Sequence, residues 1–412
     1  MAPGGQVREF HLEAKQAKWE ITPGIVTDSW TYNGQVPGPE LRAREGDLVR
    51  VIITNHLPVP TTIHWHGVEL NYKMDGVPGV TQEAIKPGET FTYEFVAYPA
   101  GTRMYHSHQD TTSQLELGLY GALIIEPRHG PKYDVDRTII LRERALDFTP
   151  EVARGLRELR GADAGNGRGG ALQYDLFLMD GKAGSAIPPV RVKPHQRVLL
   201  RLINLGHLVH AIHLHGHTFT IVATDGNPVP PGGRLRKDTV TIGPGERYDV
   251  EVYAENPGVW MLHCHMPNHG ENGMMTLMEY EGFPALRPHV HIQPRQRPGA
   301  AGAAPPTAGS LAASGPPPAT PSGGTGNRPA VTIPIVDNRF VLDALEVRVG
   351  TRVVWLNRGQ NIHTTTSLDG LWDSPSVQRK GTYSFVFTKP GEYRYICREH
   401  LLQGMVGTIT VK

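Results

Sequence analysis

The chain has 412 residues, which is long enough for about two to four domains. Its 41 lysines and arginines nearly balance its 40 aspartates and glutamates, so the net charge gives no reason to expect a nucleic acid or an acidic membrane as a partner. No apolar run is long enough to cross a bilayer, and two cysteines cannot form a disulfide framework.

Residues 1–130 contain apolar segments divided by the turn sequences VPGP and KPGE, which predicts short strands at 48–55, 91–98 and 119–127. Two H-x-H pairs lie among them, His64/His66 in TTIHWHG and His106/His108 in MYHSHQD. Strand alternation places both imidazoles of such a pair on one face. Chance explains a single pair, but two pairs in one domain favour a metal site.

Ser107 stands where a later motif has a cysteine. Without a thiolate, the first domain is expected to hold no blue-copper site and to supply imidazoles only.

Residues 131–285 repeat this pattern. The segment 198–223 carries His210, a third pair at His213/His215, and His217, which follows Gly216 and is expected either to pack or to support a ligand from outside the ligand set. The segment 237–254 predicts two strands about a PGE turn, and residues 161–171 predict a loop tip.

The stretch WMLHCHMPNHGENGMM, residues 260–275, concentrates the chemistry. In a strand Cys264 faces one way, and the fourth pair, His263 and His265, faces the other. The Cys264 thiolate, the His269 imidazole and the Met274 thioether supply most of a blue-copper site. His210 is the natural second imidazole, while the flanking histidines bind metal on the far face. A zinc site, or a buried thiol among surface histidines, is the alternative for an isolated HCH motif.

Residues 286–330 are rich in Pro, Gly and Ala and predict a flexible linker. A linker of about 36 residues spans roughly 30–36 Å, so the segment after it can reach its own subunit or a neighbour.

Residues 331–412 predict a third strand-rich domain with a second ligand set: His363, Cys397, His400 and Met405. Ile396 and Arg398 flank Cys397, so this site has no histidine path to further metals and is suited to passing one electron. A Cys264–Cys397 disulfide is the alternative, but each cysteine lies in its own ligand pattern.

Three copper ions sharing the eight paired imidazoles would leave positions for a small ligand, at an interface between the first two domains. The four pairs, NGQVPGPELRAREGDLVRVIITN and HCHMPNHGENGM together resemble the multicopper oxidases. Residues from about 20 to 285 resemble the two-domain small laccases, and residues 331–412 resemble plastocyanin-like cupredoxins.

This resemblance implies an all-β fold of three cupredoxin-like Greek-key β-sandwiches, at 1–130, 131–285 and 331–412, with 286–330 as the flexible Pro/Gly/Ala-rich linker. It also implies a homotrimer in which each trinuclear cluster lies between domain 1 of one subunit and domain 2 of the next.

The resemblance further assigns about five copper ions per chain. His210, Cys264, His269 and Met274 match the type 1 ligands. His64 and His213 match those of the type 2 ion. The type 3 pair takes His66, His106, His108, His215, His263 and His265. The third domain adds a second type 1 site at His363, Cys397, His400 and Met405.

Asp75 matches an acidic residue near the trinuclear cluster that orients water and relays protons, although an aspartate beside Gly76 is also a common turn residue. Glu271 is a second candidate for this work, displaced by one position from the family pattern. A tyrosine found near the cluster in some small laccases falls at Leu70, with Tyr72 close by.

The expected function is therefore one-electron oxidation of phenols, aromatic amines or metal ions, coupled to the reduction of O2 to water. The tethered cupredoxin is expected to relay electrons from a protein donor. A copper nitrite reductase and a non-catalytic copper or electron-transfer protein are the alternatives. A periplasmic or extracellular location is expected because copper is usually loaded outside the reducing cytosol, with any signal peptide already removed from this sequence.

Overall fold

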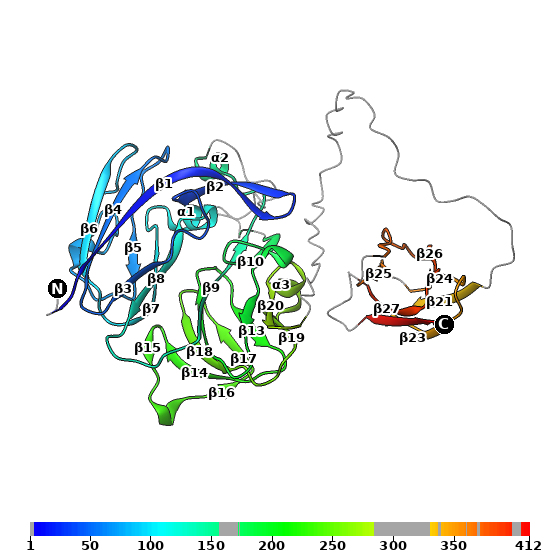
Figure 1. The fold of residues 1–412 in the computed structure, drawn as a ribbon. Coiled ribbons are helices and arrows are strands. Elements are labelled where there is room, and N and C mark those ends of the chain that lie inside the picture. The colour runs from blue at the N-terminus through cyan, green and yellow to red at the C-terminus, as the bar shows by residue number, and fades with distance from the viewer. Residues whose placement is uncertain are drawn as a thin grey trace. The chain divides into compact units, whose positions relative to one another are not determined.

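The computed structural model describes residues 4–155, 172, 174–283, 330–336, 339–359, 361–368, 371–397 and 405–412. The chain divides into two compact units, residues 1–295 and 296–412. Figure 1 shows strands as the dominant element in both units. The predicted loop at 161–171 lies outside the described residues, as does the predicted linker apart from Ala330. Within the described part, no helix has the length and apolarity needed to cross a membrane.

The first sandwich consists of two four-stranded sheets, in the orders β2-β1-β4-β6 and β3-β8-β7-β5. Its longest helix, α1 (Thr111–Leu117), follows β7, and the short helix η1 (Tyr72–Met74) lies between β5 and β6. The short helix α2 (Pro150–Ala153) lies between β9 and β10 of the second sandwich. The strands are β1 (Val7–Thr22), β2 (Ile25–Tyr32), β3 (Leu41–Arg44), β4 (Leu48–Asn55), β5 (His64–His66), β6 (Thr90–Val96), β7 (Gly101–His106) and β8 (Tyr120–Glu126).

Strict alternation of apolar residues explains why these segments form half-buried strands. Along β4, every second residue is buried. The buried faces of the two sheets meet in a core that contains Trp30, Trp65 and Tyr93. The strands predicted at 48–55, 91–98 and 119–127 are confirmed as β4, β6 and β8.

The second sandwich pairs a seven-stranded sheet with a five-stranded sheet. The first has the order β10-β9-β12-β18-β14-β15 with β16 beside β14, and the second has the order β11-β20-β19-β13-β17. The strands of the larger sheet are β9 (Val135–Arg144), β10 (Leu176–Met179), β12 (Arg197–Asn204), β14 (Phe219–Thr224), β15 (Asn227–Pro228), β16 (Arg236–Lys237) and β18 (Arg247–Tyr253). Those of the smaller sheet are β11 (Val190–Val192), β13 (His210–Leu214), β17 (Thr239–Ile242), β19 (Val259–Cys264) and β20 (Met275–Tyr280). The helices are α3 (Pro267–Glu271), η2 (Gly184–Ala186) and η3 (Pro231–Gly233).

The strands predicted around the PGE turn are present, but β17 and β18 belong to opposite sheets of this sandwich. The turn therefore links the two layers and does not close a hairpin. Cys264 and Met274 are part of the core between those layers.

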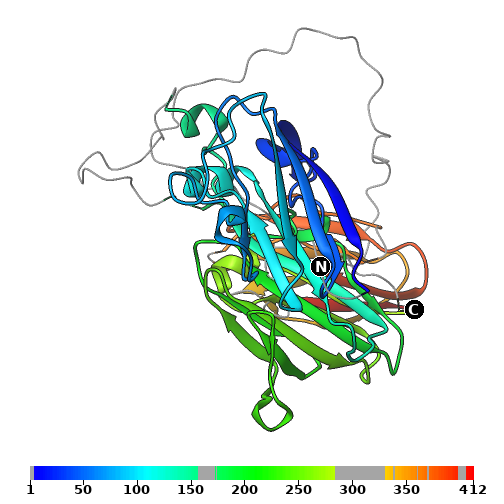
Figure 2. The ribbon, with the colours of Figure 1, turned by 90° about the vertical axis from the view of Figure 1, so that its left-hand side faces the viewer.

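The first two sandwiches pack directly on each other, as the two views of the ribbon show (Figures 1 and 2). A separate apolar cluster at their junction includes Met104 and Tyr120 from the first and Ile140 and Ile203 from the second. Arg103, which is 2% exposed, donates to backbone oxygens of the second sandwich. This packing fixes the relative positions of the candidate ligands in the two sandwiches.

The second unit is a smaller sandwich of two four-stranded sheets, in the orders β22-β21-β24-β26 and β23-β28-β27-β25. Its core contains Trp355, Tyr395, Cys397 and Met405. The strands are β21 (Ala330–Val336), β22 (Arg339–Phe340), β23 (Ala344–Val347), β24 (Arg352–Asn357), β25 (Thr366–Ser367), β26 (Thr382–Val386), β27 (Gly391–Ile396) and β28 (Val406–Val411).

One local device recurs in all three sandwiches. The first strand of each pairs in parallel with a strand that ends in an asparagine, at Asn55, Asn204 and Asn357. Each asparagine side chain donates to two backbone oxygens and accepts from the backbone N–H two residues later. The expected all-β fold of three cupredoxin-like sandwiches is confirmed.

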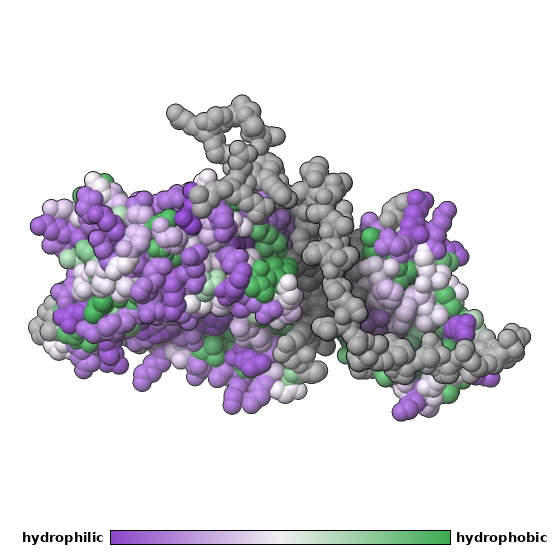
Figure 3. Space-filling view, turned by 90° about the horizontal axis from the view of Figure 1, so that it is seen from above, coloured by the Kyte–Doolittle hydropathy of each residue, from purple (hydrophilic) through white to green (hydrophobic). Residues whose placement is uncertain are grey.

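The visible face of each unit in Figure 3 is mainly hydrophilic, with apolar side chains in separate small groups.

Candidate metal centre

Three side chains meet inside the second sandwich, from three different elements. Cys264 ends β19, His210 begins β13, and His269 lies in α3. The Nδ1 atoms of His210 and His269 are 3.1 Å apart, and the Cys264 Sγ is 3.6 Å from the His269 Nδ1. His210 is 0%, Cys264 is 1% and His269 is 4% exposed. We call them, together with Met274, the thiolate site.

Met274 is joined to the thiolate site by the backbone. Its carbonyl accepts the Cys264 N–H at 3.0 Å, its own N–H donates to the His269 carbonyl at 3.0 Å, and its side chain is fully buried. The structure thus brings the side chains of His210, Cys264 and His269 together, and it buries Met274 beside them in the chain.

The electrostatics of this set suit a soft metal ion. Burial alone would raise the pKa of the Cys264 thiol, but hydrogen bonds from His210 and His269 outweigh it and lower the pKa to about 6. Two imidazole nitrogens and a thiolate thus converge in the buried interior of the sandwich. This donor set fits copper bound in the blue-copper manner.

Four histidines gather on the first sandwich, and we call them the first quartet: His64, His66, His106 and His108. Antiparallel pairing of β5 with β7 sets His64 directly opposite His106. Ring nitrogens of His64, His66 and His106 all lie within 4.8 Å of one another.

The second quartet repeats this arrangement on the second sandwich, with His213, His215, His263 and His265. Antiparallel pairing of β13 with β19 sets His213 opposite His263. The Nε2 atoms of His215 and His263 are 3.1 Å apart. Because Cys264 separates His263 from His265, one strand end serves both the thiolate site and this quartet.

Several of these imidazoles are held neutral, which is the form that binds metal. Burial lowers the pKa of His66 and of His263 to about 4, with smaller contributions from neighbouring charges. Burial lowers the pKa of His106 to about 3. Backbone carbonyls face the Nδ1 atoms of His106 and His263 at 3.0 Å, so their Nε2 atoms remain for a ligand.

The two quartets differ from the thiolate site in exposure. Seven of their eight histidines are half-buried or exposed, whereas the three donors around Cys264 are buried. All eight are described, and among the described residues no ring contact joins a histidine of one quartet to a histidine of the other. Within one chain, each quartet therefore presents half of a ligand set to its surroundings.

Asp75 lies against the first quartet. Its carboxylate Oδ1 is 3.2 Å from the His64 Nδ1, and its backbone carbonyl is 2.9 Å from the same atom. Gly76 follows with φ +79°, and a Cβ there would lie 1.8 Å from the Ile63 carbonyl oxygen. The turn and the proposed functional role of Asp75 are thus compatible, because the turn delivers the carboxylate to His64.

The other acidic candidate lies differently. Glu271 is exposed at the end of α3, and among the described residues no hydrogen bond or ion pair joins it to a histidine. Its role remains a prediction. Tyr72 is 65% exposed. The His217 Nε2 lies 2.6 Å from the Tyr280 hydroxyl, and its Nδ1 lies 3.1 Å from the backbone carbonyl of His215 in the second quartet.

At the corresponding place, the first sandwich has the backbone contacts of the thiolate site but different side chains. Of these replacements, the sequence alone indicated only Ser107. The Ser107 N–H donates to Leu119, as the Cys264 N–H does to Met274, and the Leu119 N–H donates to Gln114, as that of Met274 does to His269. Thr61 precedes His64 by three residues, as His210 precedes His213.

Three of the four replacements, Thr61, Ser107 and Gln114, are joined by side-chain hydrogen bonds, and Leu119 is the fourth. The Gln114 Oε1 accepts from the Ser107 and Thr61 hydroxyls at 2.6 and 2.8 Å. The first sandwich therefore has no thiolate, imidazole or thioether at this place, as expected from Ser107.

The third sandwich brings two of its predicted donors close together and a third into the same core. The Cys397 Sγ is 3.8 Å from the His363 Nδ1, and the Thr364 N–H donates to the thiol at 3.3 Å. Met405 is buried and its carbonyl accepts the Cys397 N–H at 3.0 Å. His400 lies outside the described residues.

Family models match nearly the whole chain. Residues 13–130 and 163–282 each match a multicopper oxidase model, and residues 311–411 match a cupredoxin-like domain.

Individual relatives agree with these matches. Multicopper oxidase MmcO of Mycobacterium tuberculosis is 34% identical over 260 residues, covering 58% of this chain and 50% of that protein. Laccase-2 of Botryotinia fuckeliana is 32% identical, covering 71% of this chain and 52% of that protein. This chain thus spans about half the length of these curated relatives. The solved structure of the blue copper oxidase from Nitrosomonas europaea is 37% identical, with a TM-score of 0.60, and covers 67% of this chain and 86% of that one.

Proposed function

Because this chain belongs to the multicopper oxidase family, we propose that it is a laccase-like oxidase that takes single electrons from a reducing substrate and reduces O2 to water. Bound copper would supply both the one-electron acceptance at the thiolate site and the O2 chemistry at the histidine quartets. The observation that carries the proposal is the end of β19, where Cys264 enters the buried thiolate site while its neighbours His263 and His265 join the second quartet.

The proposed ligand roles follow the matching positions. The thiolate site holds a type 1 ion, His64 and His213 hold a type 2 ion, and the remaining six quartet histidines hold a type 3 pair. The third sandwich holds a second type 1 ion through His363, Cys397, His400 and Met405, giving about five copper ions per chain.

We further propose that the chain works as a homotrimer, with the first quartet of one subunit facing the second quartet of the next. The half-exposed quartets support this, because metal-binding imidazoles in a finished cluster are enclosed by their ligands and by protein. Within the chain, the described residues leave each quartet with half of the expected ligands.

Asp75 is proposed to act at the first quartet. Its backbone carbonyl faces the His64 Nδ1 at 2.9 Å and its carboxylate lies 3.2 Å from the same atom, so the two oxygens orient the ring and leave the Nε2 free for metal. The carboxylate is one-third exposed, so it can also exchange protons with water beside the cluster. Replacing Asp75 with Asn is expected to slow O2 reduction while the blue absorption of the thiolate site persists. An unchanged rate of reoxidation would remove Asp75 from the mechanism.

The proposed donors are phenols, aromatic amines or low-valent metal ions, and the third sandwich is proposed to relay electrons from a protein donor. The two cysteines give a matched pair of variants. Cys264→Ser is expected to abolish O2 uptake with every donor, because the quartets lose their electron source. Cys397→Ser is expected to slow only the reaction with a bulky protein donor. Equal rates for Cys397→Ser and the parent with both donor classes would contradict the relay.

Two alternatives make different predictions. A copper nitrite reductase needs a blue-copper site in the first sandwich, where Thr61, Ser107, Gln114 and Leu119 stand instead. A copper carrier would consume no O2. Metal analysis combined with O2 uptake and nitrite turnover separates the three, and the oxidase proposal requires about five copper ions per chain with O2 as the acceptor. We propose a periplasmic or extracellular location, where copper is available for loading.

A further inference from the structure

Glu143 is a buried carboxylate that touches a proposed copper ligand from outside the ligand set. It is the second-last residue of β9, and its side chain is fully buried. Its Oε1 lies 2.9 Å from the His210 Nε2, on the side of the ring opposite the Nδ1 that faces the thiolate site.

The carboxylate accepts from two backbone N–H groups and lies against the His210 ring. The Leu208 N–H donates to Oε1 at 2.9 Å and the His207 N–H donates to Oε2 at 2.9 Å. These two donors suit an ionised, acceptor-only carboxylate, and the His210 Nε2 lies at ion-pair distance from its Oε1. A His210 ring with its proton on Nε2 would place that proton against the carboxylate and leave the Nδ1 lone pair directed into the site.

The loop between β12 and β13 is shaped around this carboxylate. Asn204 accepts the Gly206 N–H at 2.8 Å and so fixes the start of the loop. A Cβ on Gly206 would lie 2.4 Å from the Glu143 Oε2 and 2.5 Å from its Oε1. Position 206 thus has no room for a side chain while the Glu143 carboxylate is in place. The glycine therefore permits the close approach of the loop to Glu143.

The first sandwich provides an internal comparison. Leu141 is opposite Asn204 in the parallel pairing of β9 with β12, and Ala14 is opposite Asn55 in the pairing of β1 with β4. Two residues further along, the second sandwich has Glu143 and the first has Gln16, which is exposed. The carboxylate is present where the thiolate and imidazoles are present, and absent where hydrogen-bonded Thr, Ser and Gln replace them.

We propose that Glu143 is the positioning residue of the thiolate site: by accepting the His210 Nε2–H, it fixes the copper-binding tautomer of His210 and makes the imidazole a stronger donor, which lowers the reduction potential of the site. A carboxylate paired with the far nitrogen of a ligating imidazole increases the basicity of the ring, and such partners are worth about 10- to 100-fold in metal affinity or activity. Stronger donation favours the oxidised ion. This inference rests on the proposed copper assignment of the thiolate site.

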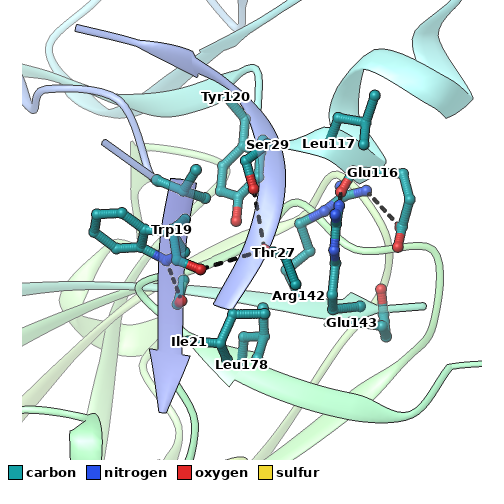
Figure 4. A pocket seen from close by; sticks show the side chains of 14 residues that line it. Trp19, Ile21, Thr27, Ser29, Glu116, Leu117, Tyr120, Arg142, Glu143 and Leu178 are labelled. Atoms are coloured by element: carbon teal, nitrogen blue, oxygen red, sulfur yellow. Dashed lines mark hydrogen bonds and ion pairs between the residues drawn. The ribbon is translucent and has the colours of Figure 1, made fainter. Parts of the chain in front are cut away.

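A matched control is Glu116 of α1, which pairs with the strand neighbour of Glu143. Arg142 pairs with Glu116 at 3.3 Å, and Glu116 also accepts the Ala145 N–H at 2.7 Å. Figure 4 shows this pair, with Glu143 close by but joined to neither residue. Both carboxylates are fully buried, but of these two described residues only Glu143 contacts a residue of the thiolate site.

The test is a spectroelectrochemical titration of the copper-loaded full chain, followed at the blue absorption band and repeated in a Cys397→Ser background so that a single blue site is observed. Glu143→Gln is expected to shift the midpoint potential upward relative to its parent. Glu116→Gln is expected to shift the midpoint potential by only a small fraction of the change seen in Glu143→Gln. An unchanged potential in Glu143→Gln, or an equal shift in both variants, overturns the inference. A parent protein with no blue band refutes the copper assignment instead, so the two failures are distinguishable.

A second variant keeps the test decisive if Glu143→Gln does not fold. Gly206→Ala retains the charge but drives the carboxylate away from the loop, because the new methyl group occupies the place of the two oxygens. An upward shift of the midpoint potential is expected here too, and copper retention is expected to fall by about 10- to 100-fold. A potential and a copper content equal to those of the parent would contradict the proposed contact.

Discussion

The turn that holds Asp75 against His64 gives a prediction whose magnitude follows from the structure. Gly76 and Gly79 lie in one loop with positive φ of +79° and +71°, so alanine is conformationally strained at both. Around Gly79 there is no atom within 4 Å of an added Cβ. At Gly76 the Cβ would lie 1.8 Å from the Ile63 carbonyl oxygen and 3.0 Å from the His64 backbone nitrogen.

Gly79→Ala should therefore lower the unfolding free energy only by the strain of an alanine in the left-handed conformation, roughly 1–2 kcal/mol. Gly76→Ala should cost about 1–3 kcal/mol more, because the chain must retreat by roughly 1 Å to clear the methyl group. That retreat separates Asp75 from His64. A 1 Å misplacement of a catalytic group costs on the order of 100-fold in rate.

The assay is urea unfolding of both variants, followed by stopped-flow reoxidation by O2 of the fully reduced, copper-loaded proteins. Gly79→Ala should reoxidise like the parent, and Gly76→Ala should be slower while keeping the blue band of the distant thiolate site. Equal unfolding free energies and equal reoxidation rates for the two variants would refute the reasoning about this loop.

Three further predictions concern the thiolate site and the packing between the first two sandwiches. Met274→Leu preserves volume and should cost less than about 1.5 kcal/mol in urea unfolding. Loss of the proposed thioether donor should raise the midpoint potential of the thiolate site, and an unchanged potential would show that the thioether is no ligand. Arg103→Met leaves backbone oxygens of the second sandwich unpaired and should cost about 2–4 kcal/mol by the same measurement, whereas Arg50→Met, which removes only solvent-screened ion pairs, should cost less. Burial alone would raise the pKa of Asp136, but Arg201 and Arg42 outweigh it and hold the pKa below its usual 3.8. This stabilisation is present above the unfolded-state pKa and is lost as pH falls through the lower folded value, so Asp136→Asn should flatten the acid limb of the stability curve; an acid limb identical to that of the parent would contradict this role.

The sequence predicted the chemistry of the site better than its surroundings. Alternation about Cys264 correctly separated the thiol from His263 and His265, because strand geometry is local. The same rule described the pairs less well, since His108, His215 and His265 each lie one or two residues beyond a strand end. The candidate ligands thus gather where strands finish and loops can turn their side chains toward one another.

What sequence reasoning missed depends on pairing between distant segments. Glu143 reaches His210 only because β9 lies parallel to β12, and the run of Arg142, Glu143 and Arg144 resembles an exposed charged strand although all three are buried. The hydrogen-bonded replacement of the thiolate site in the first sandwich was visible only at Ser107, because Gln114 and Leu119 acquire their meaning from the backbone contacts they share with His269 and Met274.

The central claim is that the thiolate site and the two quartets act together as an oxidase. The most direct measurement is a comparison of total copper with EPR-visible copper in the fully loaded, oxidised protein. A coupled pair at the joined quartets predicts that total copper exceeds visible copper by a pair of ions per chain, with O2 uptake present. If every copper ion were EPR-visible, the quartets would form no coupled pair and the account would be contradicted.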